Sequence, residues 1–546
     1  MSSSSEYEPD SNRPFHRPGE DPTHLPPEAL TARGLADYSP KTAATVGGPQ
    51  TRPPLDKLFN APPLPPSAFS PRTFPGIDQA STQALIETLS DNHVRWHIFF
   101  NYKGFHNHAA HHILAIWALG APGPVIEAAY ATHCEYQRPA FAAPGPINKP
   151  TFNKHLGDER YYAGYLDYFS SELLQKGLKQ CLEEHIFASE ANFGTAFPEM
   201  LSRFVAGFLH PFIHVGYGAE FSSIGISAEG LAMAAVHPSS PDLLPRVWFP
   251  DVVSGVNTRG GNRTALSIVA LVSCDPRLSQ IKHMDEEMMC SKILTEHGSI
   301  IHDYVNMWKF DISTEDGIAD AIEELSWAND LIYGVGGYST DKPFSADFFL
   351  MHLVTSSIFL PSLLASIDKF SSRRLLLMAY FTSALSYYVA RGRPRLDIRS
   401  FYKSTENLVH EVPGPKTEPV SGTLPTPTSD LAQTPNAWYP MIQTTIIHPN
   451  EHLCKTQRAL AHHSSLYGTR KKGWCVPPEG RTVTAAQVVR EEEAEDKVGL
   501  QELDGTIFVR LAMLTQNRLG WMREGETAGE WDFEGFYWKP EESASV

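Results

Sequence analysis

The sequence lacks an apolar run long enough to cross a lipid bilayer. A transmembrane helix needs roughly 18 or more apolar residues in succession, and none of the segments in this 546-residue chain reaches that length. The first five residues, Met1 and four serines, also contain no hydrophobic segment of the kind found in secretion signals. We therefore expect an intracellular, cytoplasmic protein that does not engage a membrane.

Positive charge is scarce as well. The chain has 45 lysines and arginines against 62 acidic residues, a formal net charge of −17. Proteins that bind DNA or RNA gain most of their affinity from basic side chains that neutralise phosphates. This charge balance argues against a nucleic-acid partner, and against an anionic membrane surface for the same reason.

Cysteine is rare and unpaired in the sequence. The six cysteines are scattered, and no two of them form a C-x-x-C pair. This spacing excludes the usual thiolate zinc sites and does not resemble a disulfide framework. We expect all six to be reduced, mostly buried thiols.

The glycine-rich motifs of the common nucleotide sites are also missing. No G-x-G-x-x-G follows a predicted strand, and the nearest glycine cluster, at 334–337, has the wrong spacing to hold a pyrophosphate. Neither a P-loop nor a G-x-S-x-G nucleophile motif is present. A flavin-dependent monooxygenase, a P-loop enzyme and an α/β-hydrolase are therefore disfavoured.

Proline, by contrast, is abundant in two places. Residues 1–76 hold 16 of the 43 prolines, and residues 404–440 alternate proline with serine, threonine and glycine. We predict a proline-rich arm over 1–76 that is disordered or wrapped on the surface, and a flexible insertion over 404–440. The insertion divides one folded body into a first part, 77–403, and a second part, 441–540.

Within that body the apolar residues recur at helical spacing. Residues 113–119 place isoleucine, leucine and tryptophan three and four positions apart, and residues 204–212 do the same with a proline at 211 that predicts a kink. No fixed-period repeat is visible, which disfavours a helical solenoid. The predicted fold is mostly α, a single large domain resembling a helical bundle.

Histidine is the residue that points to chemistry. The chain has 23 histidines, six of them within residues 93–112. Among the histidines that stand four residues apart are His108 with His112 and His210 with His214, and His352 interrupts an apolar stretch. Two imidazoles one helical turn apart form half of a metal site, and ligation without thiolates suits iron, copper, zinc or nickel. The alternative is that each is an ordinary hydrogen-bonded histidine.

Four stretches of the sequence resemble, in order, the signatures of the questin oxidase-like family. They are H-N-H-A-A-H-H-I-L-A-I-W-A-L-G-A at 106–121, F-L-H-P-F-I-H-V-G-Y-G-A-E at 208–220, F-L-M-H-L-V-T-S-S at 349–357 and H-L-C-K-T-Q-R-A-L at 452–460. The resemblance extends over about residues 90 to 540. It does not include the proline-rich arm or the insertion.

The resemblance implies an oxidoreductase of fungal secondary metabolism. Such an enzyme uses dioxygen to open a ring of an anthraquinone- or xanthone-type aromatic polyketide by a Baeyer–Villiger-like oxidation or C–C cleavage. It also implies a non-haem iron held by four histidines and a carboxylated lysine. Matched motif by motif, the ligands are His108, His210, His214, His352 and Lys455, with His112 and His452 as alternatives.

Lys455 and the two alternative histidines each have a chemical rationale. A buried lysine has a lowered pKa, so its neutral amine can add carbon dioxide and offer a carbamate oxygen to a cation. A histidine that is not a ligand, His112 or His452, is expected to act as the base that takes a proton from a substrate phenol. For the iron enzyme, NADPH and a partner reductase are candidate sources of electrons. Two other functions stay open: an NADPH-dependent Baeyer–Villiger oxidase without a metal, and a helical scaffold with no enzymatic role.

Overall fold

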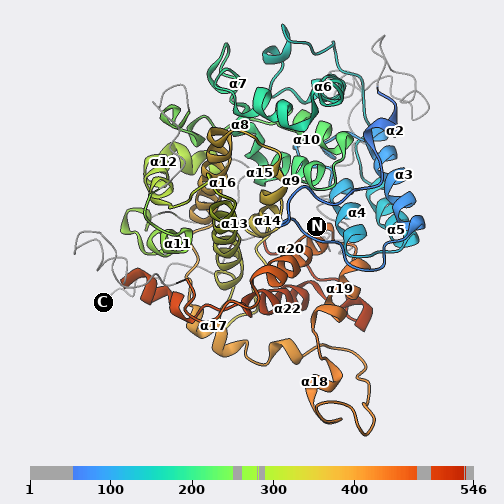
Figure 1. The fold of residues 1–546 in the computed structure, drawn as a ribbon, viewed down its shortest axis with the longest axis vertical. Helices are drawn as coiled ribbons and strands as arrows, with labels where there is room; N and C mark the ends of the chain where they lie inside the picture. Colours follow the sequence, from blue (N-terminus) through green and yellow to red (C-terminus); the bar gives the residue numbers. More distant parts are fainter. Residues whose placement is uncertain are drawn as a thin grey trace, which may run out of the picture.

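The structure is a computed structural model, and it describes residues 53–249, 261–279, 281, 289–475, 493–533 and 535. These residues form an all-α fold, and the only extended pairings among them are four isolated β-bridges. The prediction of a mostly α domain is confirmed. The arrangement is shown in Figure 1. The α-helices are α2 (Leu55–Leu58), α3 (Gln79–Arg95), α4 (Ala109–Ala118), α5 (Gly123–Cys134), α6 (Tyr162–Leu182), α7 (Glu190–Phe193), α8 (Met200–Phe204), α9 (Ala206–Glu220), α10 (Ile224–Val236), α11 (Ala265–Cys274), α12 (Met289–Met307), α13 (Glu315–Asp330), α14 (Met351–Ser357), α15 (Leu360–Ala365), α16 (Phe370–Ala390), α17 (Ile398–Ser404), α18 (Asp430–Gln433), α19 (Trp438–Ile446), α20 (Glu451–Tyr467) and α22 (Ile507–Leu519).

Several helices at the centre of the molecule are buried on every side. All ten residues of α4 and all seven of α14 are buried, as is every residue of α16 from 375 to 390. A helix without a solvent-facing side can only be stable inside a shell of other helices. Histidines on such helices are therefore held away from water.

Helix α20 joins the two parts of the chain that flank the proline-rich insertion. It packs against α4 and α14 from the first part and against α19 and α22 from the second. Thirteen of its seventeen residues are buried, including charged ones. The described helices on the two sides of the insertion therefore share one core.

Helix α9 begins with an irregular turn. Gly207, Phe208 and Leu209 have φ angles of 52°, 54° and 65°, in the left-handed region, and regular helix resumes at His210. Pro211 has no N–H, and its ring clashes with the carbonyl four residues earlier, so the preceding turn cannot be α-helical. The kink that Pro211 predicts thus lies in the turn before it.

The proline-rich arm is described from residue 53; residues 1–52 lie outside the described part. Its short helix α2 is followed by Phe59, whose ring meets the edge of His93 at a centroid distance of 5.2 Å. Further along, the Phe69 carbonyl accepts a hydrogen bond from His462 Nε2 at 2.9 Å. Residues 53–76 thus lie along the helical body.

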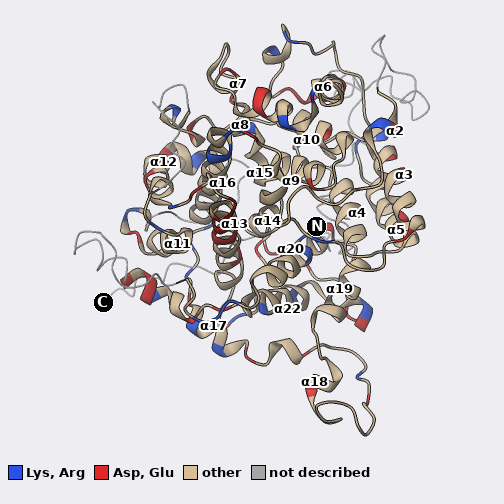
Figure 2. Ribbon diagram, in the orientation of Figure 1, with Lys and Arg blue, Asp and Glu red and all other residues tan. Residues whose placement is uncertain are grey.

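The insertion at 404–440 contains little regular structure. Helix α18 spans four residues, and Val420 and Leu424 are 76 % and 83 % exposed. In Figure 1 the loop carrying α18 extends away from the helical body. Figure 2 shows acidic residues along α13 and basic residues scattered over other helices, consistent with the net charge of −17.

No helix in the described part of the chain combines the length and apolar character that a membrane crossing requires.

Candidate metal centre

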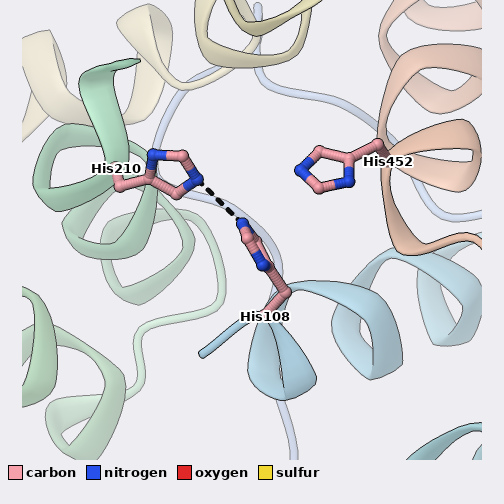
Figure 3. A group of neighbouring side chains, drawn as sticks. All are labelled: His108, His210 and His452. Atoms are coloured by element: carbon pink, nitrogen blue, oxygen red, sulfur yellow. Dashed lines mark hydrogen bonds between the residues drawn. The ribbon is translucent and has the colours of Figure 1, made fainter. Parts of the chain in front are cut away.

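Three histidines from distant parts of the sequence converge in the core. His108 lies at the N-terminus of α4, His210 on α9 and His452 on α20, and all three are buried. One nitrogen from each lies within 4.8 Å of the others. Figure 3 shows the three rings facing a common centre. This geometry allows all three side chains to bind one ion.

The His108 and His210 rings meet through their Nε2 atoms, which lie 2.8 Å apart. Metal–nitrogen bonds are about 2.0–2.1 Å long, so two imidazoles on one ion have their nitrogens roughly 3 Å apart. The observed separation is compatible with a shared cation. It is equally compatible with a hydrogen bond between neutral rings.

The backbone fixes which nitrogen His210 presents. Its Nδ1 donates to the Gly207 carbonyl at 2.5 Å. In a regular helix that carbonyl would accept from the N–H of residue 211, which proline lacks. Because Nδ1 carries the proton, Nε2 has the free electron pair and is the nitrogen available to a metal.

His352 on α14 is oriented in the same way. Its Nδ1 donates to the Phe348 carbonyl at 2.8 Å, and its buried Nε2 has no hydrogen-bond partner. The His352 ring lies 4.8 Å from that of His210 and 5.2 Å from that of His452, measured between centroids. A fourth imidazole therefore borders the same group.

Helix α20 contributes two more charged groups at this place. Lys455 lies one turn after His452, is 1 % exposed, and its Nζ has no hydrogen-bond partner. Glu451 Oε1 is 3.2 Å from His452 Nδ1 and 3.6 Å from His108 Nδ1. Its other carboxylate oxygen is buried and without a partner.

Burial keeps the four histidines in their neutral, metal-binding forms and makes Lys455 easier to deprotonate. It lowers the pKa of His108, His210 and His352 well below the ordinary 6.5, and that of His452 to about 4, with the Lys455 charge adding to the effect. Burial likewise lowers the pKa of Lys455 to about 8. A neutral imidazole can ligate a cation, and a neutral amine can react with carbon dioxide.

The donor set fits a first-row transition metal. Buried polar atoms are almost always hydrogen-bonded, yet His352 Nε2, His452 Nε2 and Lys455 Nζ all lack partners within one small region. A cation that binds these atoms would satisfy all of them at once.

His214 lies in a neighbouring hydrogen-bond network. Its Nε2 is 2.9 Å from Glu229, its Nδ1 is 3.0 Å from His111 Nε2, and Glu229 also binds His93 Nδ1 at 2.6 Å. Both ring nitrogens of His214 are thus occupied by protein partners. The structure brings His108, His210, His352 and Lys455 together with His452, and leaves His214 one helical turn away.

His112 belongs to a third chain of contacts. Its Nδ1 is 3.0 Å from His133 Nε2, and His133 Nδ1 is 2.5 Å from the hydroxyl of half-buried Tyr136. The His112 Nε2 atom is buried without a partner. Burial lowers the pKa of His112 to about 3 and that of His133 to about 4, so both are neutral near pH 7.

The family profile of questin oxidase-like proteins matches residues 105–460, more than half of the chain. The chain belongs to the questin oxidase-like family. All four histidines of the central group, and Lys455, lie inside the matched range.

Curated members and relatives of the questin oxidase-like family are distant in sequence. The chain is 26 % identical to oxidoreductase AflY of Aspergillus parasiticus over 334 residues, which cover 59 % of this chain and 65 % of the relative. It is 30 % identical to Baeyer–Villiger monooxygenase AacuH of Aspergillus aculeatus, over 52 % of this chain and 63 % of the relative. It is 31 % identical to questin oxidase of Aspergillus terreus over 29 % and 35 %. The chain thus spans a little under two thirds of the first two relatives.

The site of this questin oxidase-like protein also includes residues that sequence reasoning did not single out. Glu451 was hidden because a glutamate at the start of a helix is ordinary, although its position beside His452 was a signal. No sequence signal pointed to Glu229 or His133, because each contacts a partner that is far away in sequence. A second acidic group, Glu172 with Glu184, is joined by Lys176 at 2.5 and 2.7 Å, so an ion pair already explains it.

Proposed function

We propose that this questin oxidase-like protein is an oxidoreductase that opens a ring of an anthraquinone- or xanthone-type polyketide with dioxygen. The observation that carries the proposal is the buried group of His108, His210 and His452, bordered by His352, with His352 Nε2, His452 Nε2 and Lys455 Nζ lacking any protein partner. The printed names of relatives, a questin oxidase and a Baeyer–Villiger monooxygenase, support the reaction class. They also support a role in fungal secondary metabolism.

The proposed cofactor is a non-haem iron. His108, His210, His352 and His452 would hold it, together with a carbamate formed when the neutral Lys455 amine adds carbon dioxide. His452 takes the place that sequence comparison alone gives to His214. Bound iron would supply dioxygen activation and Lewis acidity.

Glu451 is proposed to orient two of the ligands. Its Oε1 lies within 3.6 Å of the Nδ1 atoms of both His108 and His452. These are ion-pair distances and not hydrogen bonds, since His452 Nδ1 has no hydrogen-bond partner. A carboxylate in this position favours a proton on Nδ1, which leaves Nε2 available to an ion. Desolvation alone would raise the pKa of Glu451, but the groups around it, His452 first and then His133 and Lys455, lower it below the ordinary 4.5, which keeps the carboxylate ionised.

The chain's proton-handling group is proposed to be His112. Its free Nε2 can take a proton from a substrate phenol, while its Nδ1 passes a proton to His133 Nε2, His133 Nδ1 passes one to the Tyr136 oxygen, and Tyr136 releases its own hydroxyl proton. The tautomer of each ring reverses as the proton moves. Because Tyr136 is half-buried and the two histidines are buried, this chain of contacts leads from the core toward solvent.

Two sources of electrons fit the proposed reaction. Direct use of NADPH by this chain, and delivery by a partner reductase, both fit an oxygenase. A metal-free, NADPH-dependent Baeyer–Villiger oxidase and a non-enzymatic scaffold are the competing functions, and metal content separates both from the iron enzyme.

The test is elemental analysis followed by oxygen uptake. We expect purified protein, reconstituted anaerobically with Fe(II), to hold about one iron per chain, and the His210→Ala/Lys455→Ala variant to hold almost none. Oxygen uptake with reduced hydroxyanthraquinones should require the iron. Turnover at an undiminished rate by iron-free protein with NADPH would refute the proposal in favour of the metal-free oxidase.

A further inference from the structure

A second group of unpartnered polar atoms surrounds Phe221, at the junction of α4, α9 and α20. Trp117 lies 5.8 Å from the Phe221 ring, Tyr217 lies 6.1 Å from it, and the Arg458 guanidinium lies 5.4 Å from it. Glu220, the neighbour of Phe221, forms an ion pair with Arg458. Each of these side chains is at most 5 % exposed.

Five polar atoms in this group have no hydrogen-bond partner. They are Trp117 Nε1, the Tyr217 hydroxyl, Glu220 Oε2, and Arg458 Nε and Nη1. The ion pair uses only Nη2 of Arg458 and Oε1 of Glu220. Leaving so many polar atoms unpaired in a dry interior is costly, which indicates that something absent from the protein chain binds there.

This group adjoins the candidate metal centre without being part of it. Tyr217 stacks on His111 at a centroid distance of 5.1 Å and an interplanar angle of 20°, and His111 lies 5.7 Å from His108. Arg458 follows Lys455 by three residues on α20, so the two occupy neighbouring turns of one helix face. A flat ligand of two or three fused rings could contact both places.

The chemistry of the five atoms defines the ligand. Arginine and tryptophan N–H groups only donate, so Arg458 and Trp117 require an acceptor oxygen. An ionised glutamate only accepts, so Glu220 Oε2 requires an O–H. A quinone carbonyl flanked by phenolic hydroxyls offers both, and the rings of Tyr217 and Phe221, 12° from parallel, offer aromatic contact to its planar body.

We propose that Arg458, Trp117, Tyr217 and Glu220 form a subsite that recognises the hydroxyquinone edge of the substrate. This inference rests on the substrate class of the proposed function and extends it to the residues that select the substrate. The subsite discriminates by hydrogen bonding. A substrate whose hydroxyls are methylated loses the O–H that Glu220 requires and crowds the donors.

Binding without turnover tests the subsite. The probes are 1,8-dihydroxyanthraquinone and 1,8-dimethoxyanthraquinone, titrated anaerobically into purified protein without reductant and followed by the absorbance change of the quinone. We expect the wild-type protein to bind the dihydroxy probe about tenfold or more tightly than its dimethyl ether. Tyr217→Phe and Trp117→Phe should each weaken binding of the dihydroxy probe by about 3- to 10-fold and reduce the preference for it over the dimethyl ether.

A charge-neutral variant tests the ion pair without leaving a lone buried charge. Arg458→Gln/Glu220→Gln removes both charges together, and we expect it to abolish the preference for the dihydroxy probe. Tyr380→Phe is the matched control, because that hydroxyl already contacts Asn329 and Ser356. It should lower Tm and leave the preference unchanged, whereas Tyr217→Phe, which removes no protein hydrogen bond, should leave Tm almost unchanged.

Two results would overturn the subsite. One is a wild-type protein that binds both probes equally or binds neither; the other is a preference that survives in Tyr217→Phe and in Arg458→Gln/Glu220→Gln. Ordered water in place of a ligand would produce the second result. Iron content is measured on the same samples. Failure of the iron proposal can therefore be distinguished from failure of the subsite proposal.

Discussion

The carbonyl of Gly207 accepts the Nδ1 proton of His210 because the residue four positions after Gly207 is proline. An N–H at position 211 would compete for that carbonyl, and the left-handed turn at 207–209 would no longer be needed. A backbone irregularity set by one proline therefore determines which nitrogen of His210 faces the other histidines.

Pro211→Ala is expected to weaken iron binding by about 10- to 100-fold, since the new N–H competes with His210 for Gly207 and frees the ring to rotate. Equilibrium titration with Fe(II) under anaerobic conditions measures the change. Pro440→Ala, in α19 and outside the histidine group, is the control and should bind iron as the wild type does. Equal affinities for the two variants would contradict the assigned role of Pro211.

A comparison of His352→Gln with His214→Gln separates the proposed ligand set from the one that includes His214. His352→Gln should lose most of the iron, because Nε2 of His352 has no other function in the fold. His214→Gln should keep the iron and lose roughly 1–3 kcal/mol of unfolding free energy, because it breaks the contacts to Glu229 and His111. Elemental analysis gives the iron content per chain, and urea denaturation gives the unfolding free energy. Loss of iron in His214→Gln would show that His214 belongs to the ligand set.

Carbamate formation at Lys455 is expected to be visible in solution. Protein equilibrated with ¹³C-bicarbonate should show one carbamate resonance that is absent in Lys455→Gln and present in Lys179→Gln, whose lysine is 57 % exposed. Because the pKa of Lys455 is about 8 and only the neutral amine reacts, the signal of the metal-free protein should grow as pH rises from 6 to 8. A spectrum unchanged by Lys455→Gln would rule out a carboxylated Lys455.

The Asp347–Arg391 ion pair is expected to be essential for stability. Both side chains are fully buried, 2.7 Å apart, and Asp347 also accepts the backbone N–H groups of Phe349 and Leu350 just before α14. Asp347→Ala leaves a buried, uncompensated arginine and should cost about 3–5 kcal/mol of unfolding free energy. The exposed Lys179–Asp368 pair has the same 2.7 Å separation, and Asp368→Ala should cost roughly 0–1 kcal/mol. Similar losses in both variants would show that burial is not the deciding factor.

Buried neutral histidines should make the protein lose stability in mild acid. Burial, aided by the charges of His463 and Arg458, lowers the pKa of His462 to about 3, while the unfolded chain has a pKa of about 6.5. The unfolded state therefore takes up the proton first, so the contribution is complete above pH 6.5 and is lost as pH falls toward 3. Urea denaturation from pH 7 to 4 should show a shallower pH dependence in His462→Gln, by up to about 1.4 kcal/mol per pH unit. An unchanged slope would show that His462 is protonated in the folded protein.

The sequence by itself determined the helical architecture and the general region of the site. Apolar spacing of three and four residues is a local property, and a proline at 211 excludes a regular turn before it whatever surrounds it. The ordered motifs around His108, His210, His352 and His452 were visible for the same reason, since each lies within a few consecutive residues.

Only the tertiary structure decided which of those histidines come together. Within the pair His210 and His214, both lie on one face of α9, yet neighbouring helices supply partners to both nitrogens of His214 and leave Nε2 of His210 facing His108. The lowered pKa of Lys455 is likewise a property of the helices packed around α20. Spacing along a helix determines the direction in which a side chain points, whereas burial and contacts between helices determine its environment. The environment of the imidazole nitrogens distinguishes a metal ligand from a hydrogen-bonded core histidine.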